Sequence, residues 1–233
     1  MSSVATPRPR LESALEGVEG WLDLAEAQTL NELAARHPST KPLTVVEIGS
    51  WKGRSTIALA LGLAERGADS GTVYAIDPHT GSKEHREQLG EVDTFAEFEQ
   101  NLERAGIRDR VEPIRAFSHE AVSRFAPGSI DVLFVDGSHE YEDVKRDIRE
   151  WMPLLADRAS VGFNDPWWPS VFRALQEDVI RGTSAFRSPR VVENTLFFER
   201  HANEPTTIGD RVRGATWRAE YLARLLHLRY VRK

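Results

Sequence analysis

Residues 45–56 read VVEIGSWKGRST. A hydrophobic run here reaches an acidic residue, Glu47, then crosses two glycines, Gly49 and Gly53, and leads into a helical segment. A parallel α/β sheet forms a nucleoside-binding loop in this way, at the carboxyl end of its first strand. Glycines let the backbone approach a ligand closely, and free N–H groups at the start of a helix bind anionic groups. The segment therefore predicts a cofactor-binding loop.

The glycine spacing argues against two phosphate-binding motifs. A dinucleotide loop has the pattern G-x-G-x-x-G, whereas three residues separate Gly49 from Gly53. A P-loop has the pattern G-x-x-x-x-G-K-[ST], but this loop is one residue shorter and has Arg54 in place of the lysine. The pattern E-x-G-x-x-x-G resembles the cofactor loop of class I S-adenosylmethionine-dependent methyltransferases.

The composition is that of a globular α/β protein. The chain has 233 residues, of which 40% are hydrophobic, enough for one domain with a full core. No apolar run approaches the roughly 18 residues of a membrane span, and the N-terminus lacks the apolar centre of a secretory signal. The absence of cysteine excludes disulfides and thiolate metal sites. We expect a cytoplasmic protein without integral membrane association.

The charge is unevenly distributed. Residues 210–233 carry a net charge of +5, whereas the whole chain has −6, which leaves −11 on the remainder. A basic tail is able to bind phosphate, a membrane or a partner subunit. We favour a docked amphipathic helix instead, because one continuous apolar stripe runs along the tail, formed by Trp217, Tyr221, Leu225 and Leu228. We expect no nucleic-acid partner, and a homodimer remains open.

Strands and helices alternate along the chain, which indicates a doubly wound, mostly parallel sheet. Helices are expected at 18–36, 55–66, 94–105, 139–151 and 170–180, with a capping box of Thr94 and Glu97. The expected strands are 43–48, 72–76, 111–114, 131–135, 160–163, 191–192 and 195–198. The last two form an antiparallel hairpin, so this seven-stranded, Rossmann-like arrangement again resembles the class I methyltransferase fold. We divide the chain into an N-terminal helical cap (1–42), a methyltransferase domain (43–200) and the C-terminal helix (201–233).

Asp77 ends the second predicted strand, 28 residues after Gly49. A carboxylate at that strand end can accept both hydroxyl groups of a ribose. The alternative is a turn residue before Pro78. Residues 79–93 then form a long polar loop, which is either a lid or ordinary surface.

Polar side chains also follow the fourth and fifth predicted strands. Asp136 comes after residues 131–135, and Asn164 and Asp165 come after residues 160–163. Because neighbouring strands lie about 5 Å apart, these three side chains should share one gap. Their oxygen atoms suit Mg²⁺ or a similar cation. The alternatives are that Asp136 binds the cofactor's amino group and that Asp165 is a turn residue.

His139 and two tryptophans complete the predicted site. A divalent cation lowers the pKa of an alcohol, and a nearby imidazole then takes its proton. His139, three residues after Asp136, can serve as that base, although a half-buried histidine in a first helical turn is the simpler interpretation. Trp167 and Trp168 follow the predicted ligands and offer aromatic faces to a sugar or an aromatic acceptor, or else pack in the core.

The segment from Asp136-Gly-Ser-His139 to Leu155 resembles the metal-dependent sugar O-methyltransferases of actinobacteria, which act on macrolide sugars, rhamnose and mannose units. The resemblance covers about residues 20–180. It implies that His139 is the base, with Asp136 beside it, and that Asp136, Asn164 and Asp165 hold Mg²⁺. This sequence departs from the family pattern at Asn164, where the family usually has an acidic residue or histidine. The predicted cofactor-binding residues are Glu47, Gly49, Ser50, Gly53, Ser55, Asp77, Phe117, Ser118 and Asp136. Ser55 is expected to bind the carboxylate of the cofactor. Ser118 is expected to contact its adenine, and the alternative is that Ser118 caps the following helix.

The sequence therefore predicts an S-adenosylmethionine-dependent, cation-assisted O-methyltransferase acting on a carbohydrate hydroxyl. A catechol-type acceptor fits the same chemistry. Amine methylation of nucleic acid is disfavoured, because Asp165-Pro166-Trp167-Trp168 departs from the [DN]-P-P-[FYW] signature of those enzymes. A non-catalytic cofactor-binding or nucleic-acid-binding protein is the last alternative.

Overall fold

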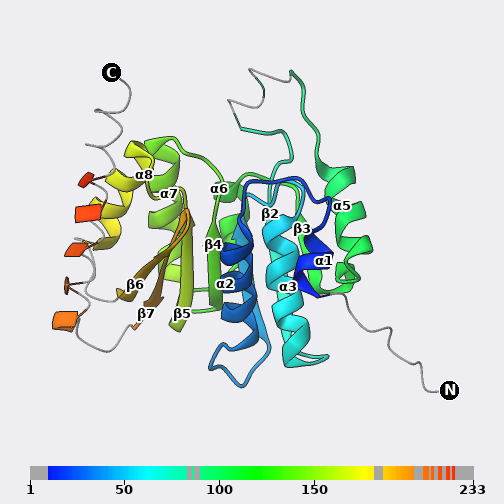
Figure 1. The fold of residues 1–233 in the computed structure, drawn as a ribbon, viewed down its shortest axis with the longest axis horizontal. Coiled ribbons are helices and arrows are strands. Elements are labelled where there is room, and N and C mark those ends of the chain that lie inside the picture. The colour runs from blue at the N-terminus through cyan, green and yellow to red at the C-terminus, as the bar shows by residue number, and fades with distance from the viewer. Residues whose placement is uncertain are drawn as a thin grey trace. The chain divides into compact units, whose positions relative to one another are not determined.

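The structure is a computed structural model of the chain. It describes residues 10–82, 86, 90–180 and 186–201, and within the C-terminal segment residues 207–209, 211–212, 215–216, 219–220 and 222–223. The chain divides into two compact units, residues 1–121 and residues 122–233 (Figure 1).

The first unit is built on three parallel strands in the order β3-β2-β1. Leu43 of β1 pairs with Gly71 of β2, and Val73 of β2 pairs with Val111 of β3. The strands are β1 (Leu43–Ile48), β2 (Gly71–Ile76) and β3 (Val111–Ile114). The helices are α1 (Leu11–Leu15), α2 (Leu24–Ala35), α3 (Arg54–Arg66), α5 (Phe95–Arg104), the 3₁₀ turn η1 (Arg108–Arg110) and α6 (Ser118–Ala121).

Helices α2 and α3 pack closely against each other in this unit. Gly62 of α3 makes this possible, because a Cβ atom there would lie 2.2 Å from the carbonyl oxygen of Asn31 in α2. The Asn31 side chain in turn donates to the carbonyl of Ala58. Residues 55–63 of α3 are all buried, so this helix forms the centre of the unit's core.

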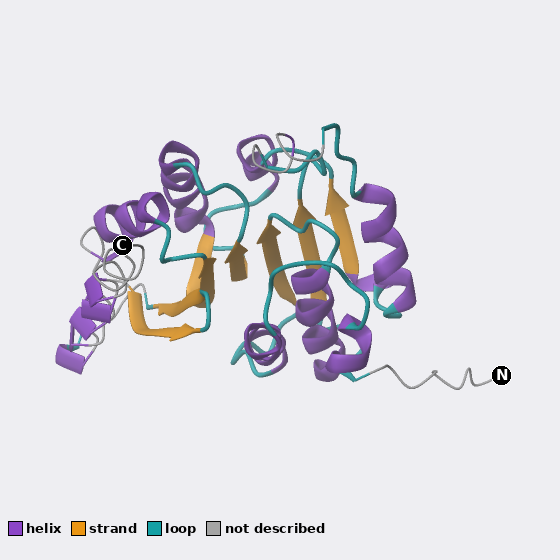
Figure 2. Ribbon diagram, turned by 45° about the horizontal axis from the view of Figure 1, so that its top comes forward, coloured by secondary structure: helices purple, strands orange, loops and turns teal. Residues whose placement is uncertain are grey.

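The described part of the second unit contains a sheet with helices beside it (Figure 2). Strands β4 and β5 are parallel, and β7 pairs antiparallel with both β5 and β6. The strands are β4 (Ile130–Val135), β5 (Leu155–Asn164), β6 (Phe186–Val192) and β7 (Thr195–Arg200). The helical segments are α7 (Tyr141–Trp151), α8 (Pro169–Ala174) and the π-helix η4 (Leu175–Ile180), with 3₁₀ turns η2 (Val122–Arg124) and η3 (Met152–Leu154).

The fold-class prediction is confirmed, because the chain forms a mostly parallel seven-stranded α/β sheet with a terminal antiparallel hairpin. The predicted helix at 18–36 begins later, at Leu24. Asp23 and Glu26 form a capping box there, in which Glu26 accepts the Asp23 N–H and the Asp23 side chain accepts a backbone N–H of the first turn. Strand β5 starts at Leu155, five residues before the predicted boundary.

The predicted division of the chain into three parts, with boundaries after residues 42 and 200, remains a prediction.

The predicted capping box of Thr94 and Glu97 is wrong. Thr94 precedes α5, but its hydroxyl donates to the carbonyl of Trp51 and lies 2.9 Å from His79 Nδ1. Glu97 forms an ion pair with Lys52 instead. These tertiary contacts occupy both side chains, which sequence spacing alone does not reveal.

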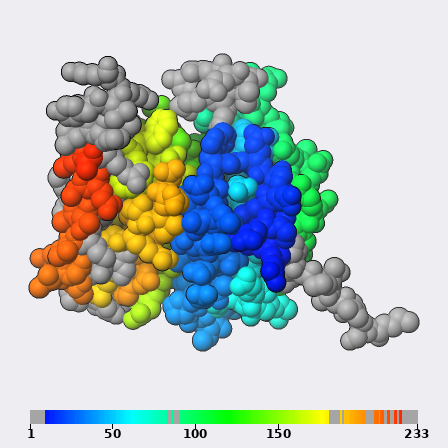
Figure 3. All heavy atoms as spheres, in the orientation of Figure 1, coloured from blue at the N-terminus to red at the C-terminus, as the bar shows by residue number. Residues whose placement is uncertain are grey.

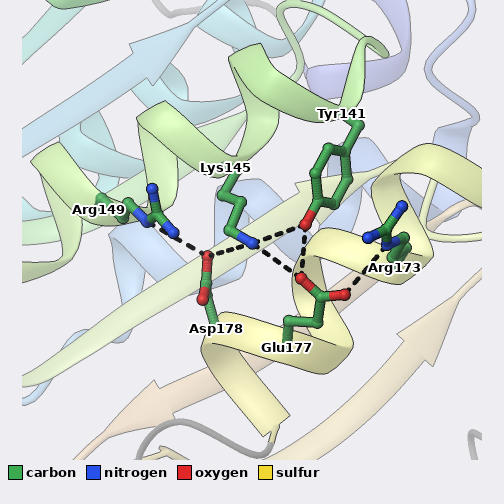
Figure 4. A network of polar contacts seen from close by, with 6 residues as sticks. All are labelled: Tyr141, Lys145, Arg149, Arg173, Glu177 and Asp178. Carbon is green, nitrogen blue, oxygen red and sulfur yellow. Dashed lines mark hydrogen bonds and ion pairs between the residues drawn. The ribbon is translucent and has the colours of Figure 1, made fainter.

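A polar network joins α7 to the segment formed by α8 and η4 (Figure 4). The Glu177 carboxylate accepts from Lys145 Nζ at 2.8 Å, from Arg173 Nε at 3.0 Å and from the Tyr141 hydroxyl. Asp178 forms ion pairs with Lys145 and Arg149. These bonds hold the pKa of Glu177 at about 2, below its ordinary 4.5. The network therefore fixes α7, whose first residue follows the His139 loop, to the helix after β5.

None of the helices in the described part of the chain has the length and apolar character needed to cross a bilayer. The predicted apolar stripe of the C-terminal helix, Trp217, Tyr221, Leu225 and Leu228, lies outside the described residues. Its docking remains a prediction.

Candidate functional site

The glycine-rich loop of the first unit follows β1 and leads into α3. Gly49 and Gly53 have φ angles of 89° and 92°, and Trp51 between them has a φ of 47°. A Cβ atom on Gly53 would also lie 3.2 Å from the Phe98 ring of α5. The loop thus needs glycine at position 53 for both its backbone angle and its packing.

Asp77 closes this loop against the end of β2. Its Oδ2 accepts the N–H of Trp51 at 2.7 Å, and its Oδ1 accepts the N–H of His79 at 2.6 Å. The side chain is nearly buried. Asp77 thereby links two segments of the predicted cofactor site and fixes the shape of the glycine-rich loop.

His79 belongs to the same cluster, although no motif in the sequence points to it. The ring is fully buried, lies 2.9 Å from the Thr94 hydroxyl and packs on the rings of Phe95 and Phe98. Burial lowers its pKa, so the ring is neutral at physiological pH. A neutral ring in an aromatic cluster supports the loop beside Asp77.

The remaining polar residues of the loop are buried. Glu47 is 0% exposed, and its Oε2 accepts from the Thr56 hydroxyl. Ser50 is 1% exposed, and its hydroxyl has no hydrogen-bond partner within the described residues. Ser55, also buried, lies in the first turn of α3, where backbone N–H groups lack intrahelical partners. A buried hydroxyl without a partner fits a loop that binds a polar ligand.

Arg54 has a structural role in this unit. Its guanidinium donates to the carbonyls of Leu15, Val18 and Leu22 at distances of 2.7–3.2 Å. The N-terminal segment is thus fixed over the start of α3, and Figure 3 shows dark-blue atoms of that segment around a small area of cyan atoms. Trp21 of the segment also packs on Trp51, with ring centroids 5.9 Å apart. Arg54, which stands where a P-loop has its lysine, therefore binds backbone carbonyl groups of the protein.

Phe117 and Ser118 follow β3. The Phe117 ring is exposed and stacks on His119, with centroids 5.8 Å apart. Ser118 is the first residue of α6, and Glu120 accepts the backbone N–H of Phe117. These contacts hold an exposed aromatic ring beside the helix start. The predicted contacts of Phe117 and Ser118 with adenine remain predictions.

In the second unit, Asp136 and Asn164 lie at the carboxyl ends of β4 and β5. Asn164 Nδ2 donates to Asp136 Oδ1 at 2.9 Å, which confirms that these two predicted site residues meet. The hydroxyl of Thr195 donates to Asn164 Oδ1 at 3.0 Å. Thr195 is fully buried and pairs with Asn164 in the β5–β7 ladder. Both ends of the Asn164 amide are thus hydrogen-bonded.

His139 and Asp165 form a second pair, with Nε2 of the histidine 3.2 Å from Oδ2 of the aspartate. The His139 ring stacks on Trp168 at a centroid distance of 4.6 Å and an interplanar angle of 25°. The backbone carbonyl of His139 accepts from the hydroxyl of Ser170 in α8. Three contacts from one segment therefore fix the position of the imidazole.

The turn of the β6–β7 hairpin supports this segment, a role that the sequence did not reveal. Asp165 has a φ of 50°, and its N–H donates to the carbonyl of Asn194 at 2.7 Å. The indole N–H of Trp167 donates to the carbonyl of Glu193 at 3.3 Å. The sequence predicted the hairpin, but the role of its turn depends on the pairing of β7 with β5.

The predicted magnesium ligands do not fit a cation in this arrangement. The Asn164 amide presents hydrogen atoms to Asp136 and has its oxygen engaged by Thr195, while Asp165 is paired with His139. Within the described residues, no three histidine, aspartate or glutamate side chains lie close enough together to hold a metal ion. The magnesium prediction is not confirmed.

Comparison with known proteins identifies the family. Residues 46–166, more than half of the chain, match the family model described as a methyltransferase domain. The chain belongs to this methyltransferase family. The prediction of a methyltransferase is thereby confirmed. The matched segment runs from the glycine-rich loop to the residues that follow β5.

The chain is similar in sequence to an uncharacterized protein and in fold to solved O-methyltransferases. An uncharacterized protein of Sinorhizobium fredii, y4gI, is 30% identical over 125 residues, which are 54% of this chain and 13% of that protein. The O-methyltransferase of Bacillus cereus, solved with S-adenosylhomocysteine, is 15% identical over 85% of this chain and 93% of its own, with a TM-score of 0.59. TomG of Streptomyces achromogenes, solved with S-adenosylmethionine, is 15% identical over 85% and 92%, also with a TM-score of 0.59. The methyltransferase fold is thus shared at low sequence identity.

Proposed function

We propose that this methyltransferase transfers the methyl group of S-adenosylmethionine to a hydroxyl group of a sugar or oligosaccharide. The observation that carries the proposal is the pair formed by His139 and Asp165, with Trp168 stacked on the imidazole. Three properties support it in turn: the cofactor loop of the first unit, the base of the second unit and the aromatic surface beside that base.

The cofactor assignment is supported by the loop from Gly49 to Gly53 and by Asp77. The loop has a buried hydroxyl at Ser50 that finds no hydrogen-bond partner in the described part of the chain, and it leads into the first turn of a 13-residue helix. S-adenosylmethionine supplies an electrophilic methyl group on a sulfonium ion. The N–H groups at the start of α3 suit the carboxylate of its methionine part, because a helix N-terminus carries partial positive charge.

A hydroxyl acceptor is supported by the imidazole of His139. An alcohol is a weak nucleophile until a base removes its proton, and histidine is the commonest base for that step. A carboxylate hydrogen-bonded to the imidazole fixes its orientation and stabilises the imidazolium that forms. The Asp165 carboxylate lies 3.2 Å from Nε2 of His139, which places it for this role.

A carbohydrate acceptor is supported by the rings beside His139. Trp168 is 45% exposed, which is unusual for so large an apolar side chain, and one indole face packs on the imidazole. Exposed indoles suit the apolar C–H faces of a sugar ring. Trp167, which precedes Trp168 in the chain, is held by the bond from its indole N–H to the carbonyl of Glu193.

The proposal is tested by mass spectrometry of acceptors incubated with the enzyme and S-adenosylmethionine carrying a labelled methyl group. The panel contains mono- and oligosaccharides, catechols and short nucleic acids. We expect label on a sugar hydroxyl. Label on catechols alone would favour the catechol-type alternative, and label on a nucleobase would contradict the proposal. Trp168→Ala should raise KM for the sugar more than it lowers kcat.

A further inference from the structure

The polar side chains at the ends of β4 and β5 satisfy one another. Asn164 donates a hydrogen bond to Asp136, and Oδ2 of Asp165 lies 3.2 Å from Nε2 of His139, so each carboxylate has a side-chain partner. In a metal site these same carboxylates would point lone pairs at a cation. In this structure the carboxylates are directed at Asn164 and His139 instead.

Asn164 is held in one orientation by its neighbours. The Thr195 hydroxyl is a donor to Asn164 Oδ1, which leaves the Nδ2 end directed at Asp136. Thr195 is fully buried and fixed by its register with Asn164 in the sheet. An amide N–H₂ group so placed donates a hydrogen bond to the Asp136 carboxylate and stabilises it without a cation.

Asp165 is positioned by the backbone. Its left-handed φ of 50° and the bond from its N–H to the carbonyl of Asn194 set the direction of its side chain. The carboxylate then reaches His139 Nε2, while Trp168 covers one face of the ring. A base oriented by a carboxylate is the arrangement that activates hydroxyl nucleophiles in enzymes without metals.

We infer that methyl transfer by this chain needs no divalent cation: His139 is the base, Asp165 is its positioning residue, and the Asn164–Asp136 hydrogen bond satisfies a carboxylate that a cation would otherwise bind. In the tautomer in which Nε2–H donates to Asp165, Nδ1 carries the lone pair that takes the acceptor's proton. The acceptor oxygen forms a bond to the methyl carbon as the carbon–sulfur bond breaks. That electron pair stays on sulfur, giving S-adenosylhomocysteine. The inference rests on the proposed function.

The first test is direct binding of Mn²⁺, followed by its electron paramagnetic resonance signal, together with turnover of the labelled sugar in EDTA. We expect no site for Mn²⁺ on the wild-type chain and turnover unchanged by EDTA. A single Mn²⁺ site that disappears in Asp136→Asn, together with turnover lost in EDTA and restored by Mg²⁺, would overturn the inference. If no acceptor is methylated, the proposed function fails, whereas the Mn²⁺ titration still decides whether a cation site exists.

The second test uses Asn164→Asp, which places a third carboxylate beside Asp136 and Asp165. We expect this variant to acquire one Mn²⁺ site and a turnover that Mg²⁺ stimulates. The matched control is Glu140→Gln, a charge change at an exposed residue of the same loop, which should leave both readouts as in the wild type. A wild-type chain that already binds Mn²⁺ as tightly as the variant would contradict the role assigned to Asn164.

The third test separates positioning from structural support at Asp165. Asp165→Asn keeps an oxygen that can accept from Nε2–H but loses the negative charge, whereas Asp165→Ala loses both. We expect kcat to fall in the order wild type, asparagine, alanine, with KM for S-adenosylmethionine unchanged. Equal loss in the two variants, accompanied by loss of cofactor binding, would indicate a structural role and count against the inference.

Discussion

The Nε2 atom of His139 lies 3.2 Å from Oδ2 of Asp165, and the two residues come from segments that follow different strands of the sheet. The imidazole is also stacked on Trp168 and tied through its backbone carbonyl to Ser170. Its position therefore depends on both the loop after β4 and the loop after β5. This convergence makes the histidine suitable as a base.

Replacement of His139 tests its part in the chemistry. His139→Ala should lower turnover by about 10²–10⁴-fold, because the acceptor hydroxyl loses the group that takes its proton. Affinity for S-adenosylhomocysteine, measured by isothermal titration calorimetry, should stay near that of the wild type, since the predicted cofactor loop lies at residues 49–56. Unchanged turnover would remove His139 as the base.

Asp77 should control cofactor binding through the glycine-rich loop. Asp77→Ala removes the acceptor of the Trp51 and His79 N–H groups. Hydrogen bonds to a charged group contribute about 1.5–3 kcal/mol each, so loss of one bond alone corresponds to roughly a tenfold or greater loss of affinity if the loop is released. Calorimetry with S-adenosylhomocysteine measures the effect. Asp77→Asn, which keeps one acceptor oxygen, should be milder, and equal affinities for all three proteins would refute this role.

Arg54 should hold the N-terminal segment in place. Arg54→Ala removes donors to the carbonyls of Leu15, Val18 and Leu22, which we expect to destabilise the segment by about 2 kcal/mol or more. Limited proteolysis should then cleave within residues 11–23 faster than in the wild type. Arg36→Ala, which removes an arginine from an exposed pair with Glu32, serves as the control and should not change the cleavage rate. Equal cleavage of Arg54→Ala and wild type would contradict the prediction.

The Glu177 network should make the free energy of unfolding depend on pH in the acidic range. The folded-state pKa of Glu177 is about 2, below the ordinary 4.5, because Lys145, Tyr141 and Arg173 bind its carboxylate. The ionised form therefore stabilises the fold, and this contribution is complete above pH 4.5 and is lost as the pH falls towards 2. Glu177→Gln should be less stable than the wild type at neutral pH, and the difference should shrink across that window.

Urea unfolding followed by tryptophan fluorescence at a series of pH values measures this dependence. Glu103→Gln, at an exposed residue of α5, is the control and should keep the pH profile of the wild type. A constant difference between Glu177→Gln and the wild type from pH 7 to acid would show that the ionisation of Glu177 does not contribute.

The α/β alternation, the glycine-rich loop after β1, the terminal hairpin and the meeting of Asp136 with Asn164 could all be predicted from the sequence. These features follow from local signals, because hydrophobic periodicity, glycine spacing and the ends of neighbouring strands are all visible along the chain. The predicted capping box of Thr94 and Glu97 is wrong because both side chains have partners that are distant in the sequence. Thr94 contacts Trp51 and His79, and Glu97 forms an ion pair with Lys52.

The pairing of the polar groups depends on contacts between segments that are distant in the sequence. Asn164 was selected as a metal ligand from its residue type, but its amide is oriented by Thr195, whose position depends on the antiparallel register of β5 and β7. Asp165 reaches His139 because the hairpin turn holds its backbone. Hydrogen bonds are directional and short-ranged, so which donor meets which acceptor is fixed by packing between segments distant in sequence.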